Sequence, residues 1–167
     1  MRKHPRLRVG VLLLAWASST AVLSGDAGTP AVDFELSNGQ HFVRLADLPA
    51  QITVINFWRH DCPACLREMP TFAQQTKLDG SLVVTVALHR PAEDALAPEA
   101  VRAALTALKT LYGPSDPRGL LARFGDPTGA LPHTVIFDAT HQICLKRTGE
   151  VDAPWLSSAI EYCKKPH

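Results

Sequence analysis

The alternation of apolar and polar residues changes character along the chain and predicts an α/β protein. Residues 32–48 alternate on either side of an Asn-Gly pair, which predicts a short β-hairpin. Residues 52–58 and 81–88 are runs of β-branched and other apolar residues, typical of central strands buried on both faces. Between them, apolar residues recur at spacings of three and four, which predicts a helix over residues 63–78.

The second half of the chain continues with helices and strands. Val101, Leu105 and Leu108 recur at helical spacing and predict a helix over residues 97–113, ended by Gly113. After it we expect a helical turn with a loop, two strands and a last helix, at residues 117–132, 133–138, 142–149 and 155–163. Strand–helix–strand units imply parallel pairing, whereas the last two strands are close enough in sequence only for a hairpin. The expected architecture is a mixed central sheet flanked by helices on both faces, with an N-terminal β-hairpin extension.

The first 25 residues differ from the rest of the chain. Four basic residues precede an apolar run that continues to Leu23, and small residues follow before Asp26. This layout predicts a signal peptide at residues 1–25 and a single domain at residues 26–167, in the periplasm or secreted. The alternative is an uncleaved N-terminal membrane anchor, although the run is shorter than the roughly 20 residues that span a bilayer.

Removal of the basic N-terminal segment changes the charge of the protein. The whole chain has 17 Lys and Arg, and four of them lie in that segment, so 13 remain against 16 Asp and Glu. The resulting net charge of −3, with His neutral, does not favour nucleic-acid binding, which requires a basic face. We expect no nucleic-acid partner and a monomer.

Two of the four cysteines, Cys62 and Cys65, form a Cys-x-x-Cys at the junction of a predicted strand and a predicted helix. A helix N-terminus stabilises a thiolate on the first sulfur, and the second lies close enough to attack a mixed disulfide. In an exported chain this setting indicates a redox-active pair. The alternative is a structural disulfide.

A metal site is a second alternative for the same segment. His60, Cys62 and Cys65 are all ligand types for zinc or copper, with His133 as a fourth ligand. However, structural zinc sites usually bring two ligand pairs, and the chain has no second Cys-x-x-Cys or His-x-x-x-His. We therefore expect no metal and no cofactor, and place His60 in a solvated loop.

Two segments resemble the thioredoxin-like superfamily, in particular its exported TlpA/ResA/CcmG branch. In "NFWRHDCPACLREMP", the matching residues are Phe57, Trp58, Cys62, Pro63, Cys65, Glu68 and Pro70. In "GALPHTVIFD", Pro132 falls where that family has a cis proline facing the dithiol, and Thr134 and Asp138 also match. The resemblance covers the chain from about Ala31 to its C-terminus.

The resemblance implies a thioredoxin fold and a thiol-disulfide oxidoreductase acting on protein thiols and disulfides. Cys62 would exchange with the substrate sulfur and Cys65 would resolve the mixed disulfide, while Leu131 and Pro132 would hold the substrate backbone. It further implies a reductase supplied with electrons by a membrane partner. A dithiol oxidase or isomerase on the same fold is the alternative.

The residues that modulate the pair depart from the thioredoxin pattern. Asn56 stands where thioredoxins have a buried acid in the strand, and an amide cannot relay protons. Glu68 is the nearest acid on the helix and is expected either to modulate the pair or to be solvated. Asp61, directly before Cys62, should oppose thiolate formation, whereas a protonated His60 would favour it.

The other two cysteines, Cys144 and Cys163, lie in the last strand and at the end of the last helix. In an oxidising compartment we expect a structural disulfide between them, and two separate thiols are the alternative.

Overall fold

The computed structural model describes residues 32–78 and 80–165. The expected signal peptide at residues 1–25 lies outside this part of the chain. No helix in the described residues is long and apolar enough to cross a membrane.

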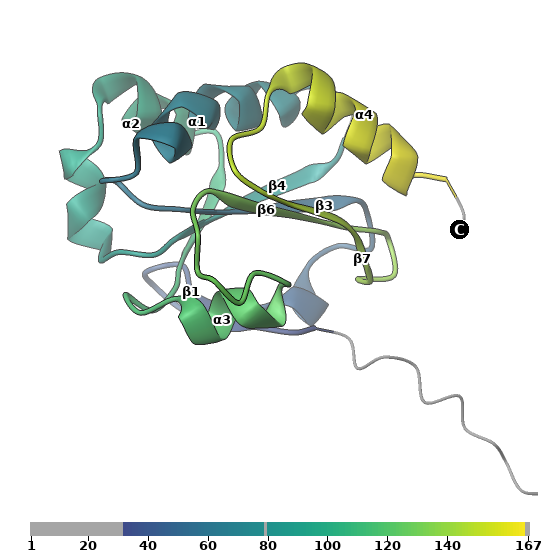
Figure 1. The fold of residues 1–167 in the computed structure, drawn as a ribbon, viewed down its shortest axis with the longest axis horizontal. Coiled ribbons are helices and arrows are strands. Elements are labelled where there is room, and N and C mark those ends of the chain that lie inside the picture. The colour runs from purple at the N-terminus through teal and green to yellow at the C-terminus, as the bar shows by residue number, and fades with distance from the viewer. Residues whose placement is uncertain (1–31, 79, 166–167) are drawn as a thin grey trace, which may run out of the picture.

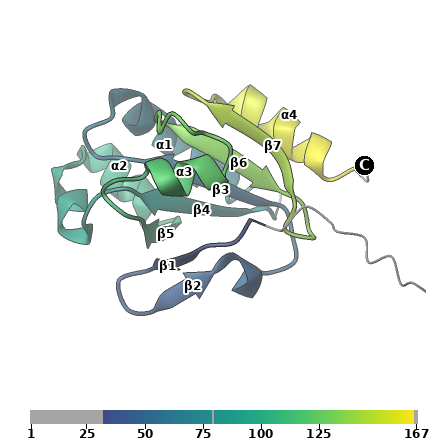
Figure 2. The same ribbon diagram turned by 60° about the horizontal axis from the view of Figure 1, so that its bottom comes forward.

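One seven-stranded sheet runs through the molecule in the order β2-β1-β5-β4-β3-β6-β7 (Figure 1, Figure 2). The strands are β1 (Glu35–Ser37), β2 (Phe42–Arg44), β3 (Thr53–Trp58), β4 (Leu82–Ala87), β5 (Lys109–Tyr112), β6 (His133–Phe137) and β7 (Ile143–Thr148). The central strands β3, β4 and β5 are parallel, and β6 joins β3 in the antiparallel sense. The expected hairpin at the N-terminus is confirmed as β1 and β2, which extend the sheet beyond β5.

Helices cover both faces of this sheet, as expected (Figure 1). They are α1 (Pro63–Gln75), α2 (Glu99–Leu105), α3 (Arg118–Arg123) and α4 (Ala153–Cys163), with 3-10 turns at Leu45–Asp47 and Pro91–Leu96. In the view of Figure 1, α1, α2 and α4 lie above the sheet and α3 lies below it. The mixed, helix-flanked sheet is a thioredoxin-like fold.

Consecutive residues of β3 show why the strand lacks a polar face. Val54 and Trp58 pack under α1, α2 and α4, whereas Ile55 and Phe57 pack on the opposite side of the sheet, and none of the four side chains is exposed. The two apolar cores fix the position of β3 between its neighbours. The C-terminal end of β3, from which the Cys-x-x-Cys segment begins, is therefore firmly held.

The helix predicted over residues 97–113 is wrong in its second half. The helix α2 ends at Leu105, and Lys109–Tyr112 form β5, parallel to β4. Thr110 and Thr85 share a hydrogen bond of 3.2 Å between their hydroxyl oxygens across the two strands. Pairing with the otherwise free edge of β4 decides the structure here, because tertiary hydrogen bonds override a local helical pattern.

Candidate active site

The Cys-x-x-Cys lies where β3 ends and α1 begins. Cys62 is the N-cap residue of α1, and Pro63 occupies the first helical position, where its missing N–H costs nothing. The two sulfurs form a disulfide in this structure. Cys65 has no exposed surface, whereas Cys62 is half-buried. Of the two, Cys62 is the sulfur that a partner can reach.

The helix end stabilises negative charge on Cys62. The backbone N–H of Cys65 donates a hydrogen bond to the Cys62 Sγ, with a length of 3.2 Å. In the reduced state the same donor, together with the positive end of the helix dipole, favours the thiolate. An accessible sulfur at a helix N-terminus, backed by a buried sulfur one turn later, is the working pair of a thiol-disulfide oxidoreductase.

Pro132 lies at the same end of the sheet as Cys62, where β3 ends and β6 begins. The Leu131–Pro132 peptide bond is cis. It directly precedes β6, whose first residue, His133, pairs with Phe57 of β3. The Pro132 carbonyl accepts a hydrogen bond of 2.8 Å from the Gly149 N–H, which fixes the loop. Leu131 is half-buried and packs against both apolar cores.

Glu68 is buried, not solvated. The side chain lies one turn after Cys65 on α1 and is 1% exposed. Its carboxylate accepts hydrogen bonds of 2.7 Å from the Asn56 Nδ2 and 2.9 Å from the Val151 N–H. Burial raises the pKa of Glu68 to about 7, although these two hydrogen bonds pull it down. A buried carboxyl group with a pKa near neutral therefore lies one turn after Cys65, and it comes from the helix instead of the strand.

Asn56 holds this carboxylate in place. Its side chain is fully buried, and Nδ2 also donates to the Thr134 hydroxyl, at 3.1 Å. Thr134 lies in β6, two residues after the cis proline. One amide thus connects the helix that carries the dithiol with the strand that carries Pro132.

The charge of Asp61 is balanced by a neighbour. Both oxygens of its exposed carboxylate accept hydrogen bonds from the Arg59 guanidinium, at 2.9 and 3.0 Å. These bonds lower the pKa of Asp61. The expected opposition of Asp61 to a Cys62 thiolate is therefore weakened, because Arg59 brings a positive charge to the same place.

His60 is half-buried, in contrast to the solvated position expected for it. Its ring lies edge-on to the ring of His89, with 4.9 Å between centroids. His89 follows β4 and is 4% exposed, and its Nε2 lies 2.8 Å from the Asp94 carboxylate. His89 was not among the residues expected from the sequence, although its position at the end of a buried parallel strand is where such folds place functional groups.

His133 does not join His60, Cys62 and Cys65. It lies on the far face of the sheet, against Phe57. Its ring nitrogens lie 2.9 Å from the Thr148 hydroxyl and 3.1 Å from the Phe124 carbonyl. The four-ligand metal site considered from the sequence therefore loses its fourth ligand.

Cys144 and Cys163 form a second disulfide, which ties α4 to β7. Cys163 is buried between α4 and the sheet, and Cys144 is half-buried. Neither cysteine begins a helix, so neither has the setting that activates Cys62.

Several solved structures share this fold. A DsbF homologue from Corynebacterium diphtheriae has a TM-score of 0.62 at 21% identity, over 91% of this chain and 99% of its own. A secreted Mycobacterium tuberculosis disulfide oxidoreductase homologous to E. coli DsbE has a TM-score of 0.60 at 19% identity, over 78% and 96%. The exposed lipoprotein thioredoxin Etrx1 of Streptococcus pneumoniae has a TM-score of 0.57 at 22% identity, over 77% and 98%.

Comparison at the sequence level gives the family. No curated protein sequence matches the chain. The model of the AhpC/TSA family matches residues 27–146, well over half of the chain, and the chain therefore belongs to the AhpC/TSA family, with a thioredoxin-like fold.

Proposed function

We propose that this protein is an exported thiol-disulfide oxidoreductase that reduces disulfides of other proteins through Cys62 and Cys65. The observation that carries the proposal is the position of Cys62, half-buried at the N-cap of α1 with its sulfur accepting the Cys65 N–H. Cys65 lies fully buried behind it. The pair is therefore divided into an attacking and a resolving sulfur.

Reduction of a substrate takes two exchanges. The Cys62 thiolate attacks one sulfur of the substrate disulfide, forms a mixed disulfide and releases the other substrate sulfur as a thiolate. The Cys65 thiolate then attacks the Cys62 Sγ, which forms the Cys62–Cys65 disulfide and releases the second substrate thiolate. Two electrons pass to the substrate, and a dithiol donor at the membrane restores the reduced pair.

The buried Cys65 thiol must lose its proton before it attacks. We assign the acceptor role to Glu68, one turn along α1, whose pKa of about 7 places half of it in the ionised form near neutral pH. Asn56 acts as a positioning residue, because its amide holds the Glu68 carboxylate at 2.7 Å.

Leu131 and Pro132 form the proposed contact with the substrate backbone. A proline at this position lacks an N–H beside the sulfurs, and the backbone of the preceding residue can pair with an extended substrate segment. The position of both residues directly before β6 and the anchoring of Pro132 to Gly149 support this role.

The reducing direction and the exported location rest on the sequence. The two motifs resemble exported reductases, and residues 1–25 have the layout of a signal peptide. The structural neighbours described as secreted or as an exposed lipoprotein support an extracytoplasmic location.

Trapping in cells tests the proposal. A Cys65→Ala variant can form a mixed disulfide but cannot resolve it, so it should accumulate covalent adducts with other proteins that disappear on reduction. The matched control is the Cys62→Ala, Cys65→Ala double variant, which should trap nothing. A Cys65→Ala protein whose Cys62 reacts with a small thiol reagent but traps no protein would contradict a role in protein disulfide exchange.

A further inference from the structure

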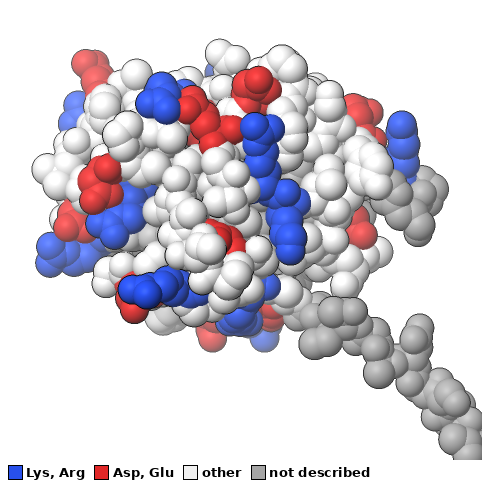
Figure 3. Space-filling view, in the orientation of Figure 1, with Lys and Arg blue, Asp and Glu red and all other residues white. Residues whose placement is uncertain are grey.

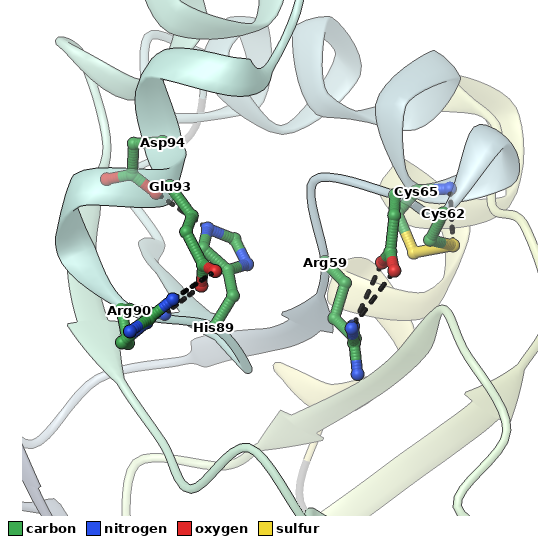
Figure 4. A network of polar contacts seen from close by, with 8 residues as sticks. Arg59, Cys62, Cys65, His89, Arg90, Glu93 and Asp94 are labelled. Atoms are coloured by element: carbon green, nitrogen blue, oxygen red, sulfur yellow. Dashed lines mark hydrogen bonds and ion pairs between the residues drawn. A yellow bond between two sulfur atoms is a disulfide. The ribbon is translucent and has the colours of Figure 1, made fainter.

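A cleft of about 360 Å³ opens beside the dithiol. It is lined by Arg59, Leu88, His89, Arg90, Glu93 and Ser115. These residues follow the C-terminal ends of β3, β4 and β5, the three parallel strands. Figure 4 shows the cleft between two groups of side chains, Arg59 near the dithiol on one side and Arg90 with Glu93 on the other. Open α/β sheets place their ligands at this edge.

Each carboxylate oxygen of Asp61, Glu93 and Asp94, around the cleft, already has a partner. Arg59 bonds both oxygens of Asp61. The backbone N–H and the Nη2 of Arg90 bond the two oxygens of Glu93, at 2.7 and 3.1 Å. The two oxygens of Asp94 contact the His89 Nε2 and accept from the Tyr112 hydroxyl, at 2.6 Å for the latter.

The two arginines, in contrast, have N–H groups that donate to no described residue. Arg59 uses its Nε and Nη2 and Arg90 only its Nη2, so within residues 32–78 and 80–165 neither Nη1 has a protein partner. His89 is 96% buried and its Nε2 faces the Asp94 carboxylate, so a neutral His89 has no further N–H to donate. The cleft therefore offers the unused guanidinium donors of Arg59 and Arg90 to a ligand that brings acceptors.

We propose that this cleft binds a carboxylate side chain of the substrate polypeptide, two or three residues away from the cysteine that Cys62 attacks. The inference rests on the proposed function, since it concerns the same substrate. Arginine is suited to the task because its planar guanidinium presents several donors at once to a carboxylate.

The order of the strands sets the distance between the cleft and the attacked cysteine. The sheet runs β5-β4-β3-β6, with the cleft above β5 and β4, Cys62 after β3 and Pro132 before β6. A substrate backbone that pairs at Leu131 and passes Cys62 continues over β4. Strands lie about 4.8 Å apart and an extended chain advances about 3.3 Å per residue, so one to two strand spacings equal about two or three residues.

The charge that selects the carboxylate is local. Acidic and basic side chains are interspersed on the face shown in Figure 3. The net charge without the N-terminal segment is −3, so the protein as a whole does not attract anions. Preference for an acidic substrate must therefore depend on Arg59 and Arg90.

Peptide substrates test the inference. Three peptides differ only in a Glu, Gln or Lys three residues from a cysteine that carries a chromogenic thiol as a mixed disulfide. The reduced protein should release the chromophore from the Glu peptide with a kcat/KM about five- to tenfold above that for the Gln peptide, and the Lys peptide should be the slowest. The advantage should shrink as salt is added, because the cleft is open to solvent.

The decisive variants are Arg90→Ala and Arg90→Glu. Arg90 is exposed, so its replacement should leave the fold intact. Arg90→Ala should lower the ratio of Glu to Gln turnover toward one while the Gln peptide is reduced as before, and Arg90→Glu should favour the Lys peptide. The matched control is Arg44→Ala. Arg44 ends β2 and pairs with Asp47 in the turn that follows, so the variant also breaks an exposed ion pair between residues three apart, and it should retain the full preference for the Glu peptide.

The outcomes separate the two proposals. Equal turnover of the three peptides by the unaltered protein, or a Glu preference that survives both Arg90 variants, would overturn the carboxylate site and leave the oxidoreductase intact. Failure to reduce any of the peptides would overturn the proposed function, and the carboxylate site with it.

Discussion

At the scale of single residues, the decisive feature is a buried carboxyl group on the helix that is held by an amide in the strand. Position 56, which holds a buried acid in thioredoxins, is an amide here, and Glu68 supplies the buried acid from α1. Asn56 and Glu68 could both be named from the sequence, because they lie at fixed positions in the segment that resembles the thioredoxin-like superfamily. The sequence could not predict the burial of Glu68, which depends on Val151 closing over the side chain from 83 residues away.

The raised pKa of Glu68 makes a prediction for stability. In the unfolded chain the carboxyl ionises near its ordinary pKa, whereas in the folded protein burial keeps it protonated up to about pH 7. Between these values the folded state binds more protons, so the free energy of unfolding should fall as the pH rises, by roughly 3 kcal/mol in total. Glu68→Gln should remove this slope in denaturant titrations between pH 4 and pH 8.

The same variant separates the two steps of the exchange. If Glu68 accepts the Cys65 proton, Glu68→Gln should slow resolution of a mixed disulfide about 100-fold, measured by stopped flow, and leave the first attack by Cys62 nearly unchanged. The rate of resolution in the unaltered protein should rise with pH through about 7, as the base ionises. Glu161→Gln, which alters an exposed carboxylate paired with Lys164, is the control. Equal slowing of both steps would point to a structural role for Glu68.

At the scale of elements, the local pattern predicted most strands and helices but misplaced one boundary. The buried runs that became β3 and β4 have no polar alternation, so their type was clear from the sequence. The segment that became β5 follows α2 without a break in helical spacing, and only the free edge of β4 makes it a strand. Strand neighbours were also needed to identify His89, because the cleft that it lines forms only where β3, β4 and β5 end side by side.

The second disulfide leads to a prediction about α4. It closes a loop over a sequence separation of 19 residues between β7 and α4. Loop-closure entropy for such a loop corresponds to about 3 kcal/mol of stability. The free energy of unfolding of the Cys144→Ser, Cys163→Ser double variant, measured by denaturant titration, should therefore be lower by about that amount. The rate of reaction at Cys62 should stay the same.

A matching control removes the other pair. The Cys62–Cys65 disulfide closes a much shorter loop, with a sequence separation of 3, so the Cys62→Ser, Cys65→Ser double variant should lose less stability. A redox role for Cys144 and Cys163 would instead appear as loss of substrate reduction in their double variant, and that result would contradict a purely structural disulfide.

At the scale of the whole molecule, the fold and the redox potential are coupled. A dithiol pair with a strongly oxidising potential belongs to a protein whose reduced form is the more stable one, and a reductase requires the opposite. The sequence could not give this balance, because it depends on every group that senses charge on Cys62. Here the helix N-terminus and Arg59 favour a thiolate, while the buried Glu68 and the Asp61 carboxylate oppose it.

The proposed reducing role predicts the outcome of that balance. The Cys62–Cys65 pair should equilibrate with dithiol buffers at a potential closer to about −270 mV than to about −120 mV. The oxidised protein should then melt at a higher temperature than the reduced one. Both measurements belong in the Cys144→Ser, Cys163→Ser background, where the Cys62–Cys65 pair is the only disulfide left to reduce. A potential near −120 mV together with a more stable reduced form would make the protein a dithiol oxidase, because electrons would then flow from substrate thiols into the Cys62–Cys65 disulfide.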